Sequence, residues 1–216
     1  MMRRRTTGMG ARMRCMGGAL AMALSLGGCT SFSRPDTPPT IFDIAPQGVS
    51  PIAVRVPMAD LEVAAPSWLS SSAMQYRLEP ASALERRVYA TSRWAGMPAE
   101  MIEVVFSRVI QTQPADNGSG CRLRIDLDEF IQRFATAEDS AGLIELRASV
   151  LAPRTDVLIA YKTFLVETPA PSPDAPGGVL ALRSGVNQLA VTLAQWLTSL
   201  ERGDTARLNV GERCSS

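Results

Sequence analysis

The residue with the clearest chemistry is Cys29, which directly follows the small pair Gly27-Gly28. Upstream lie five arginines and no acidic residue, and then an almost wholly apolar or small run over residues 16–26. A basic start, a short apolar run and small residues at the cleavage point are typical of a bacterial secretory signal peptide. A cysteine at the next position matches the lipobox. We therefore expect residues 1–28 to be removed and Cys29 to carry acyl chains such as palmitate.

The length of the apolar run separates this prediction from its alternatives. A membrane-spanning helix needs about 20 apolar residues, and the run over residues 16–26 is shorter than that. A cysteine buried in an N-terminal helix is the other alternative, and the proline-rich segment that follows argues against it. Two or three acyl chains hold a protein at a membrane far more firmly than one chain does. Thr30 stands where an aspartate would signal retention in the inner membrane, which favours the outer membrane of a Gram-negative cell, facing the periplasm.

Two cysteines, Cys121 and Cys214, remain once the signal peptide and the acylated residue are set aside. Cysteines in an oxidising compartment often pair, and the alternative is two free thiols. We expect a disulfide that fastens the C-terminal tail to a strand beginning near Cys121.

Catalysis is disfavoured by what the chain lacks. It contains no histidine, which removes the commonest general base and the histidine-dependent triads and zinc sites. We therefore predict no catalytic residue, no metal site and no cofactor. The cluster of Asp126, Asp128 and Glu129 could suggest a cation site or paired carboxylates. The favoured interpretation is that Asp126 and Asp128 share a strand face with Arg122 and Arg124 and pair across strands.

The charge of the mature chain limits its partners. Cleavage before Cys29 leaves 17 basic residues against 21 acidic ones. This balance argues against nucleic acid or an anionic lipid surface as the main partner. The 188 residues that remain fit one domain with a sizeable core.

Hydrophobic periodicity predicts the elements of this domain. After a proline-rich tether over residues 29–50, period-two alternation predicts a strand over 52–56, a strand remnant with an irregular connection over 57–72, and a strand over 73–78. Residues 80–93 fit either a short helix or a strand. Apolar residues at helical spacing predict a helix that begins near Pro98.

The second half of the chain has a clearer pattern. It predicts strands over 122–134, 143–152 and 157–166, with a bulge near Asp128-Glu129 and a turn over 153–156. A last helix is predicted over 179–200, followed by a tail over 203–216. The expected fold class is α+β, with one mainly antiparallel sheet of about four or five strands and two helices packed on one face.

The chain also resembles a known family, the ABC-type transport auxiliary lipoprotein component (PqiC-like). The resemblance covers roughly residues 40–200. It is carried by the lipobox, the strand Ile52–Val56, Gln75-Tyr76-Arg77, Tyr89 with Arg93-Trp94, Pro98-Ala99-Glu100-Met101, the Arg122–Ile125 strand ending at Phe130, and the final helix with Trp196. It implies an auxiliary lipoprotein domain over 51–202, with no catalytic residues to carry over.

This resemblance also implies partners. The lipoprotein would dock the MCE-domain periplasmic component of an ABC permease and ATPase complex at the outer membrane and so assist lipid transport. A homo-oligomer such as a ring is conceivable. The alternative is a structural or assembly lipoprotein of the envelope without lipid transfer.

Four residues are the candidates for partner binding, because Tyr, Trp and Arg are enriched at binding hot spots. They are Tyr76, Arg77, Arg93 and Trp94. The alternative is that the two aromatic rings belong to the core and the arginines are solvated.

Overall fold

A computed structural model describes residues 38–45, 48–79, 81–113, 119–201 and 209–215. The predictions for the signal peptide, for Cys29 and for Thr30 lie outside these residues. Within them the chain forms β1 (Thr40–Phe42), β2 (Ile52–Ala64), a 3-10 turn (Ser67–Leu69), β3 (Ala73–Leu78), β4 (Arg87–Trp94), α2 (Pro98–Val109), β5 (Ile110–Gln113), β6 (Cys121–Phe134), β7 (Ser140–Leu151), β8 (Leu158–Pro169), α3 (Ala175–Ser199) and α4 (Val210–Ser215). None of the helices in this part of the chain is both long and apolar enough to cross a membrane.

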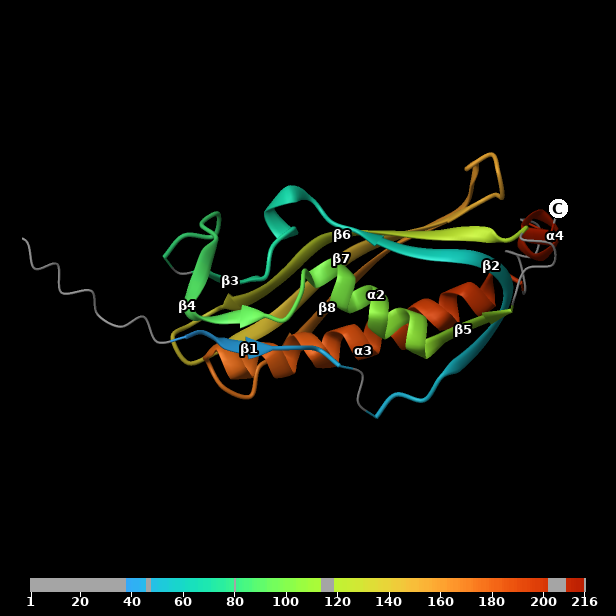
Figure 1. Ribbon diagram of the computed structural model, residues 1–216. Coiled ribbons are helices and arrows are strands. Elements are labelled where there is room, and N and C mark those ends of the chain that lie inside the picture. Colours follow the sequence, from blue (N-terminus) through green and yellow to red (C-terminus); the bar gives the residue numbers. More distant parts are fainter. Residues whose placement is uncertain (1–37, 46–47, 80, 114–118, 202–208, 216) are drawn as a thin grey trace, which may run out of the picture. The chain divides into compact units, whose positions relative to one another are not determined.

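The strands form one mixed sheet of eight strands. β6 is its centre: β7 pairs antiparallel along its whole length, whereas β2 and β3 pair in parallel with its first and last parts, respectively. β5 extends the sheet beyond β2, β8 beyond β7, and β4 followed by β1 beyond β3 (Figure 1). The prediction of a mainly antiparallel sheet of four or five strands with two helices was therefore wrong. The described residues contain eight strands and three helices, with four parallel and three antiparallel pairings.

Strand β2 accounts for part of this error, because it is 13 residues long and continues through the segment predicted to be irregular. Its first residues pair with β5 and its later residues with β6. Pro57 lies where the strand changes partner, and the β5 register shifts there. A proline removes one strand hydrogen bond, which costs least at such an irregularity. Further along β2, the Val63 amide donates to Glu103 Oε2 of α2 at 2.9 Å.

Other local predictions were confirmed. The helix begins at Pro98, the β6–β7 register shifts between Leu127 and Glu129, and residues 153–156 form the turn between β7 and β8. The ambiguous segment before Trp94 ends in the strand β4. The tether and the tail are shorter than expected, since β1 and α4 lie within them.

The core lies between the sheet and the two longer helices. α3 packs against β7, β8, β6 and β2, and α2 packs against β2 and α3. The inward-facing side chains of β6 and β7 and the sheet-facing stripe of α3 are almost completely buried: Leu123, Ile125, Leu127, Ile144, Leu146, Ala148, Val186, Leu189, Ala190, Leu193 and Leu197. The interface between helix and sheet is thus filled with side chains. The sequence alone could not distinguish this packed core from an open lipid groove.

Candidate functional site

The four residues predicted to bind a partner lie on β3 and β4, but they do not form one exposed surface. Trp94 is only 3% exposed and packs on Phe130, with ring centroids 5.4 Å apart. Arg93 donates hydrogen bonds to the backbone carbonyls of Tyr89 and Ser92. Trp94 therefore contributes to the core. Partner binding by Tyr76, Arg77, Arg93 and Trp94 remains a prediction.

Tyr76 belongs to a partly buried cluster with Tyr89, Gln132 and Ser140, beside the first turn of α3. Its ring lies 4.6 Å from that of Tyr89, whose hydroxyl donates to Gln132 Oε1 at 2.8 Å. Gln132 is buried and donates in turn to Ser140 Oγ at 2.9 Å. Burial, and to a smaller degree Tyr76 and Asp174, raises the pKa of Tyr89. Tyr89 therefore stays a neutral hydrogen-bond donor across the physiological range, and the cluster is structural.

Arg77 is held by a carboxylate that it shares with a second arginine. Glu129 Oε2 lies 3.2 Å from Arg77 Nη2 and 2.7 Å from Arg86 Nη2, and Glu129 Oε1 accepts from Arg86 Nη1 at 2.8 Å. The bulge in β6 turns this side chain towards the β3–β4 hairpin. One buried carboxylate thus organises two arginines of the hairpin, and the local charge remains positive.

Replacing Glu129 with alanine is expected to lower the free energy of unfolding by about 2 kcal/mol, because two partly buried arginines lose their counter-charge. This figure is below that of a fully buried pair, since Arg77 and Arg86 keep side-chain exposures of 19% and 29%. Denaturant unfolding at neutral pH measures the change. Glu85→Ala is the matched control, because the Glu85–Arg87 pair is solvent-exposed and its loss should be close to neutral. Equal effects of the two changes would contradict a structural role of Glu129.

The sheet face opposite α3 carries charged side chains that pair with one another. Asp126 accepts from Arg124 at 3.1 Å, and Asp128 accepts a bidentate pair of bonds from Arg147 at 2.7 and 2.8 Å. The carboxylate of Asp128 raises the pKa of Arg147. Each carboxylate of the acidic cluster in the sequence thus has its own arginine. No group of side chains suited to a metal ion occurs among the described residues.

An exposed apolar row on β8 is the surface feature that the sequence analysis missed. Leu158, Tyr161 and Leu165 are 54%, 51% and 65% exposed, respectively. Among the described strands β8 pairs with β7 alone, so its outer edge presents backbone groups that no strand covers. A long edge strand with exposed apolar side chains is a site for pairing with another chain. The alternation over 157–166 predicted the strand, but only the strand order shows that it lies at an edge.

Three hollows of the described surface are small. One of about 320 Å³ lies between α2 and the segment after β1, beside Ile44, Met101 and Val104. Two others, of about 360 and 340 Å³, lie along β2 and are lined by a mixture of polar and apolar side chains. These volumes lie at the lower end of the range for small-molecule pockets.

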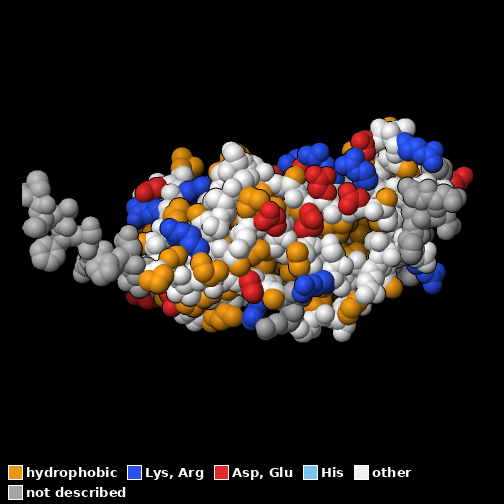
Figure 2. Space-filling view, in the orientation of Figure 1, with side chains coloured by type: hydrophobic (Ala, Val, Ile, Leu, Met, Phe, Trp, Pro, Cys, Tyr) orange, Lys and Arg blue, Asp and Glu red, His pale blue; other side chains and the backbone are white. Residues whose placement is uncertain are grey.

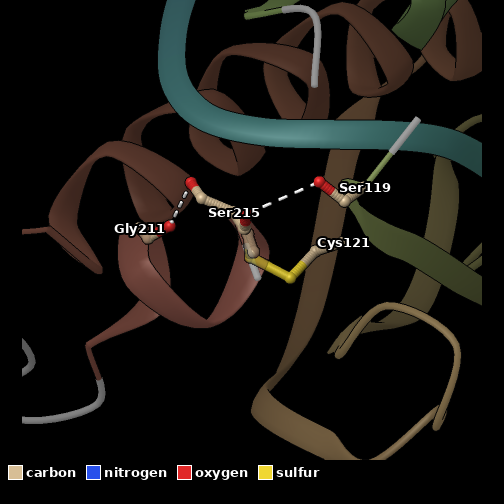
Figure 3. The surroundings of a disulfide bond; sticks show 5 residues. Ser119, Cys121, Gly211 and Ser215 are labelled. Carbon is tan, nitrogen blue, oxygen red and sulfur yellow. Dashed lines mark hydrogen bonds between the residues drawn. A yellow bond between two sulfur atoms is a disulfide. The ribbon is translucent and has the colours of Figure 1, made fainter. Parts of the chain in front are cut away.

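The cysteine pair lies at the end of the sheet opposite β1 and β4 (Figures 1 and 3). Cys121 opens β6 and Cys214 lies on α4, and their sulfurs are bonded at 1.97 Å. Both residues are fully buried. Nearby, Ser215 Oγ donates to the Gly211 carbonyl at 2.7 Å. Helix α4 contacts β2 and β6, and the disulfide would hold it against them.

Comparisons with known proteins agree with this fold. A crystal structure of a Xanthomonas campestris protein of the DUF330 family model is 20% identical, with a TM-score of 0.56, and the match covers 82% of this chain and 96% of that one. A second crystal structure, of an uncharacterised protein, is 15% identical with a TM-score of 0.57, covering 74% of this chain and 99% of the other. At these identities the likeness concerns the fold alone. No curated protein sequence matches the chain.

The family comparison is more specific. The family model described as ABC-type transport auxiliary lipoprotein component matches residues 43–194. That match spans the region from the segment after β1 to the last turns of α3 and includes strands β2 to β8, helix α2 and most of α3. The chain therefore belongs to the ABC-type transport auxiliary lipoprotein component family.

Proposed function

We propose that this lipoprotein, acylated at Cys29 and held at the outer membrane, docks the MCE-domain periplasmic component of an ABC lipid transporter. The observation that carries the proposal is the unpaired apolar edge of β8, in a chain whose family assists ABC-type transport. A docking role needs a surface, whereas a carrier role needs an enclosed apolar cavity. The filled core and the small hollows support the docking role.

The edge of β8 suits a partner that contributes a strand. Its 12 residues are long enough for several main-chain hydrogen bonds, and Leu158, Tyr161 and Leu165 would be buried by the added chain. Lys162 and Glu167 supply charges of both signs beside them. A second copy of this chain could use the same edge, so a homo-oligomer is the competing occupant of this surface.

Leu165→Lys is the variant that tests the docking surface. The lipidated protein is purified from its own membranes in detergent, and the co-purifying MCE-domain component and ATPase are quantified by mass spectrometry. We expect their recovery to fall about tenfold, because loss of one interface anchor costs at least 1.4 kcal/mol. The matched control is Val104→Lys, which changes a residue that is 48% exposed on α2 and should leave recovery unchanged.

Three outcomes would count against parts of the proposal. Equal recovery with both variants would exclude β8 as the docking surface. Recovery of envelope assembly factors without the transporter from the wild-type protein would favour the structural alternative. A change of oligomeric state caused by Leu165→Lys in the purified protein would assign the edge to a second copy instead.

A further inference from the structure

We propose that the β3–β4 hairpin (residues 73–79 and 81–94) faces the membrane that holds the lipid anchor and contacts its phospholipid headgroups through Leu84 and the surrounding arginines. This inference rests on the proposed acylation of Cys29. It adds a second surface to the domain, distinct from the edge of β8.

The start of β1 points towards the end of the sheet that carries this hairpin. β1 pairs in parallel with β4, with Thr40 beside Ser92 and Phe42 beside Trp94. The start of β1 therefore points towards the start of β4, which is the end that leads into the β3–β4 loop. The chain upstream of Thr40 leaves the sheet on that side.

The length of the chain between Cys29 and Thr40 limits how far the hairpin can lie from the bilayer. Ten residues separate the two, and ten extended residues span at most about 36 Å. From Ser92 back to Arg87 strand β4 rises about 17 Å in the same direction. The tether is therefore long enough for the loop before Arg87, which lies on the same side of the sheet as the start of β1, to reach the bilayer.

The composition of the hairpin suits a headgroup region. Leu84 at the tip of the loop is 94% exposed, and Val88 at the start of β4 is 48% exposed. Four arginines accompany two glutamates in this segment, and with Glu129 of β6 beside them the balance is one positive charge, although the mature chain as a whole is acidic. Figure 2 shows basic and apolar side chains together over this end of the domain. Exposed apolar side chains flanked by arginines are the combination that binds the interface of a bilayer with anionic lipids.

The hairpin is also held rigidly enough to present Leu84. Glu129 accepts from Arg86 at 2.7 and 2.8 Å, and Arg86 also donates to Gln75 Oε1 at 3.1 Å. Arg87 donates to both carboxylate oxygens of Glu85 at 3.0 Å. These bonds anchor the chain immediately after Leu84 to β3 and β6, and the loop tip is therefore oriented by the sheet.

Fluorescence quenching by lipid tests the orientation. A fluorophore is attached to the cysteine of Ala83→Cys, next to Leu84, in the full lipidated protein. The protein is then reconstituted into vesicles of phosphatidylethanolamine and phosphatidylglycerol. A minority lipid in these vesicles carries a nitroxide quencher on its headgroup. The control label is placed on Thr155→Cys in the β7–β8 turn. That turn adjoins the first residues of β6, whereas β3 adjoins the last, and the two labels therefore lie at opposite ends of the sheet. We expect strong quenching at residue 83 and little at residue 155.

The contribution of Leu84 is measured in the same vesicles. Leu84→Asp, with the label still on residue 83, should reduce quenching about threefold, because an exposed leucine no longer inserts into the interface. Unchanged quenching with Leu84→Asp, or equal quenching at residues 83 and 155, would overturn the inference. Flotation of the vesicles separates the proposed acylation of Cys29 from the proposed orientation of the hairpin. Protein that does not float lacks the anchor, which refutes both proposals. Protein that floats but shows equal quenching at the two positions refutes the orientation alone.

Discussion

Replacing Gly177 with alanine is expected to lower the free energy of unfolding by about 3 kcal/mol, because the added methyl group has no room. Its Cβ would overlap the backbone carbonyl oxygen of Ser172 and lie 2.6 Å from the Ser172 hydroxyl oxygen. Gly177 also donates its amide proton to Asp174 Oδ1 at 2.8 Å, which caps α3. The Ser172 hydroxyl and this amide both lower the pKa of Asp174, so the cap is charged at neutral pH. Moving the Ser172 loop away would therefore disturb the cap as well.

The same replacement at Gly211 is the control. No atom lies within 4 Å of the Cβ position at Gly211, which is also in a helix, α4. Alanine is intrinsically favoured over glycine in a helix by about 1 kcal/mol, so Gly211→Ala should be neutral or mildly stabilising. Thermal or denaturant unfolding of both variants measures the difference. A loss of similar size at both positions would show that helix propensity or the unfolded state, and not the clash, decides the effect.

Gly177 and its neighbour Gly178 also show why the start of α3 could not be predicted. Ala175-Pro176-Gly177-Gly178 has the composition of a loop, and the apolar spacing predicts a helix only from about Val179. In the structure these residues are the first turn of α3, and small residues are required because Ser172 and Gln132 approach them closely. Asp174 at the N-cap was the available signal, since aspartate is a preferred capping residue.

Local patterns predicted elements better than pairings. The helix at Pro98 and the bulge in β6 follow from spacing along one segment, and both were confirmed. The parallel pairings of β2 and β3 with the two parts of β6 join segments more than 50 residues apart, and period-two alternation carries no information about them. The proline in β2 further concealed the second half of that strand.

The candidate site shows the same difference between what local patterns predict and what only the tertiary structure shows. The types of residue at Tyr76 and Trp94 fit a binding hot spot and a core equally well, and the packing of Trp94 on Phe130 shows which applies to that ring. The exposed row on β8 was visible in the sequence as a strand, but an exposed apolar residue is informative only when its strand is known to lie at an edge. The proposed function therefore rests on the strand order and on the family. Apart from the lipobox, no sequence motif contributes as much to it.

Removing the bond between Cys121 and Cys214 is expected to have the largest effect on stability. The cysteines are 93 residues apart, and the chain-entropy model gives about 4.6 kcal/mol for a closed loop of this length. The bond also secures α4, which at six residues is too short to persist as an isolated helix. The double variant Cys121→Ala/Cys214→Ala should therefore unfold at a markedly lower denaturant concentration, and its C-terminal segment should be cleaved by protease before the rest of the domain.

Ser215→Ala is the matched control in α4, because it removes only the exposed hydrogen bond to the Gly211 carbonyl and should change the stability by less than about 0.5 kcal/mol. A thiol count on the denatured, unreduced lipidated protein provides the direct test, and we expect no free thiol. Two free thiols, together with unchanged unfolding of the double variant, would show that the tail is held by packing alone. In that case Val210, which is 2% exposed, would be the residue that fastens α4 to the sheet, and Val210→Ala would release the tail where the double cysteine variant does not.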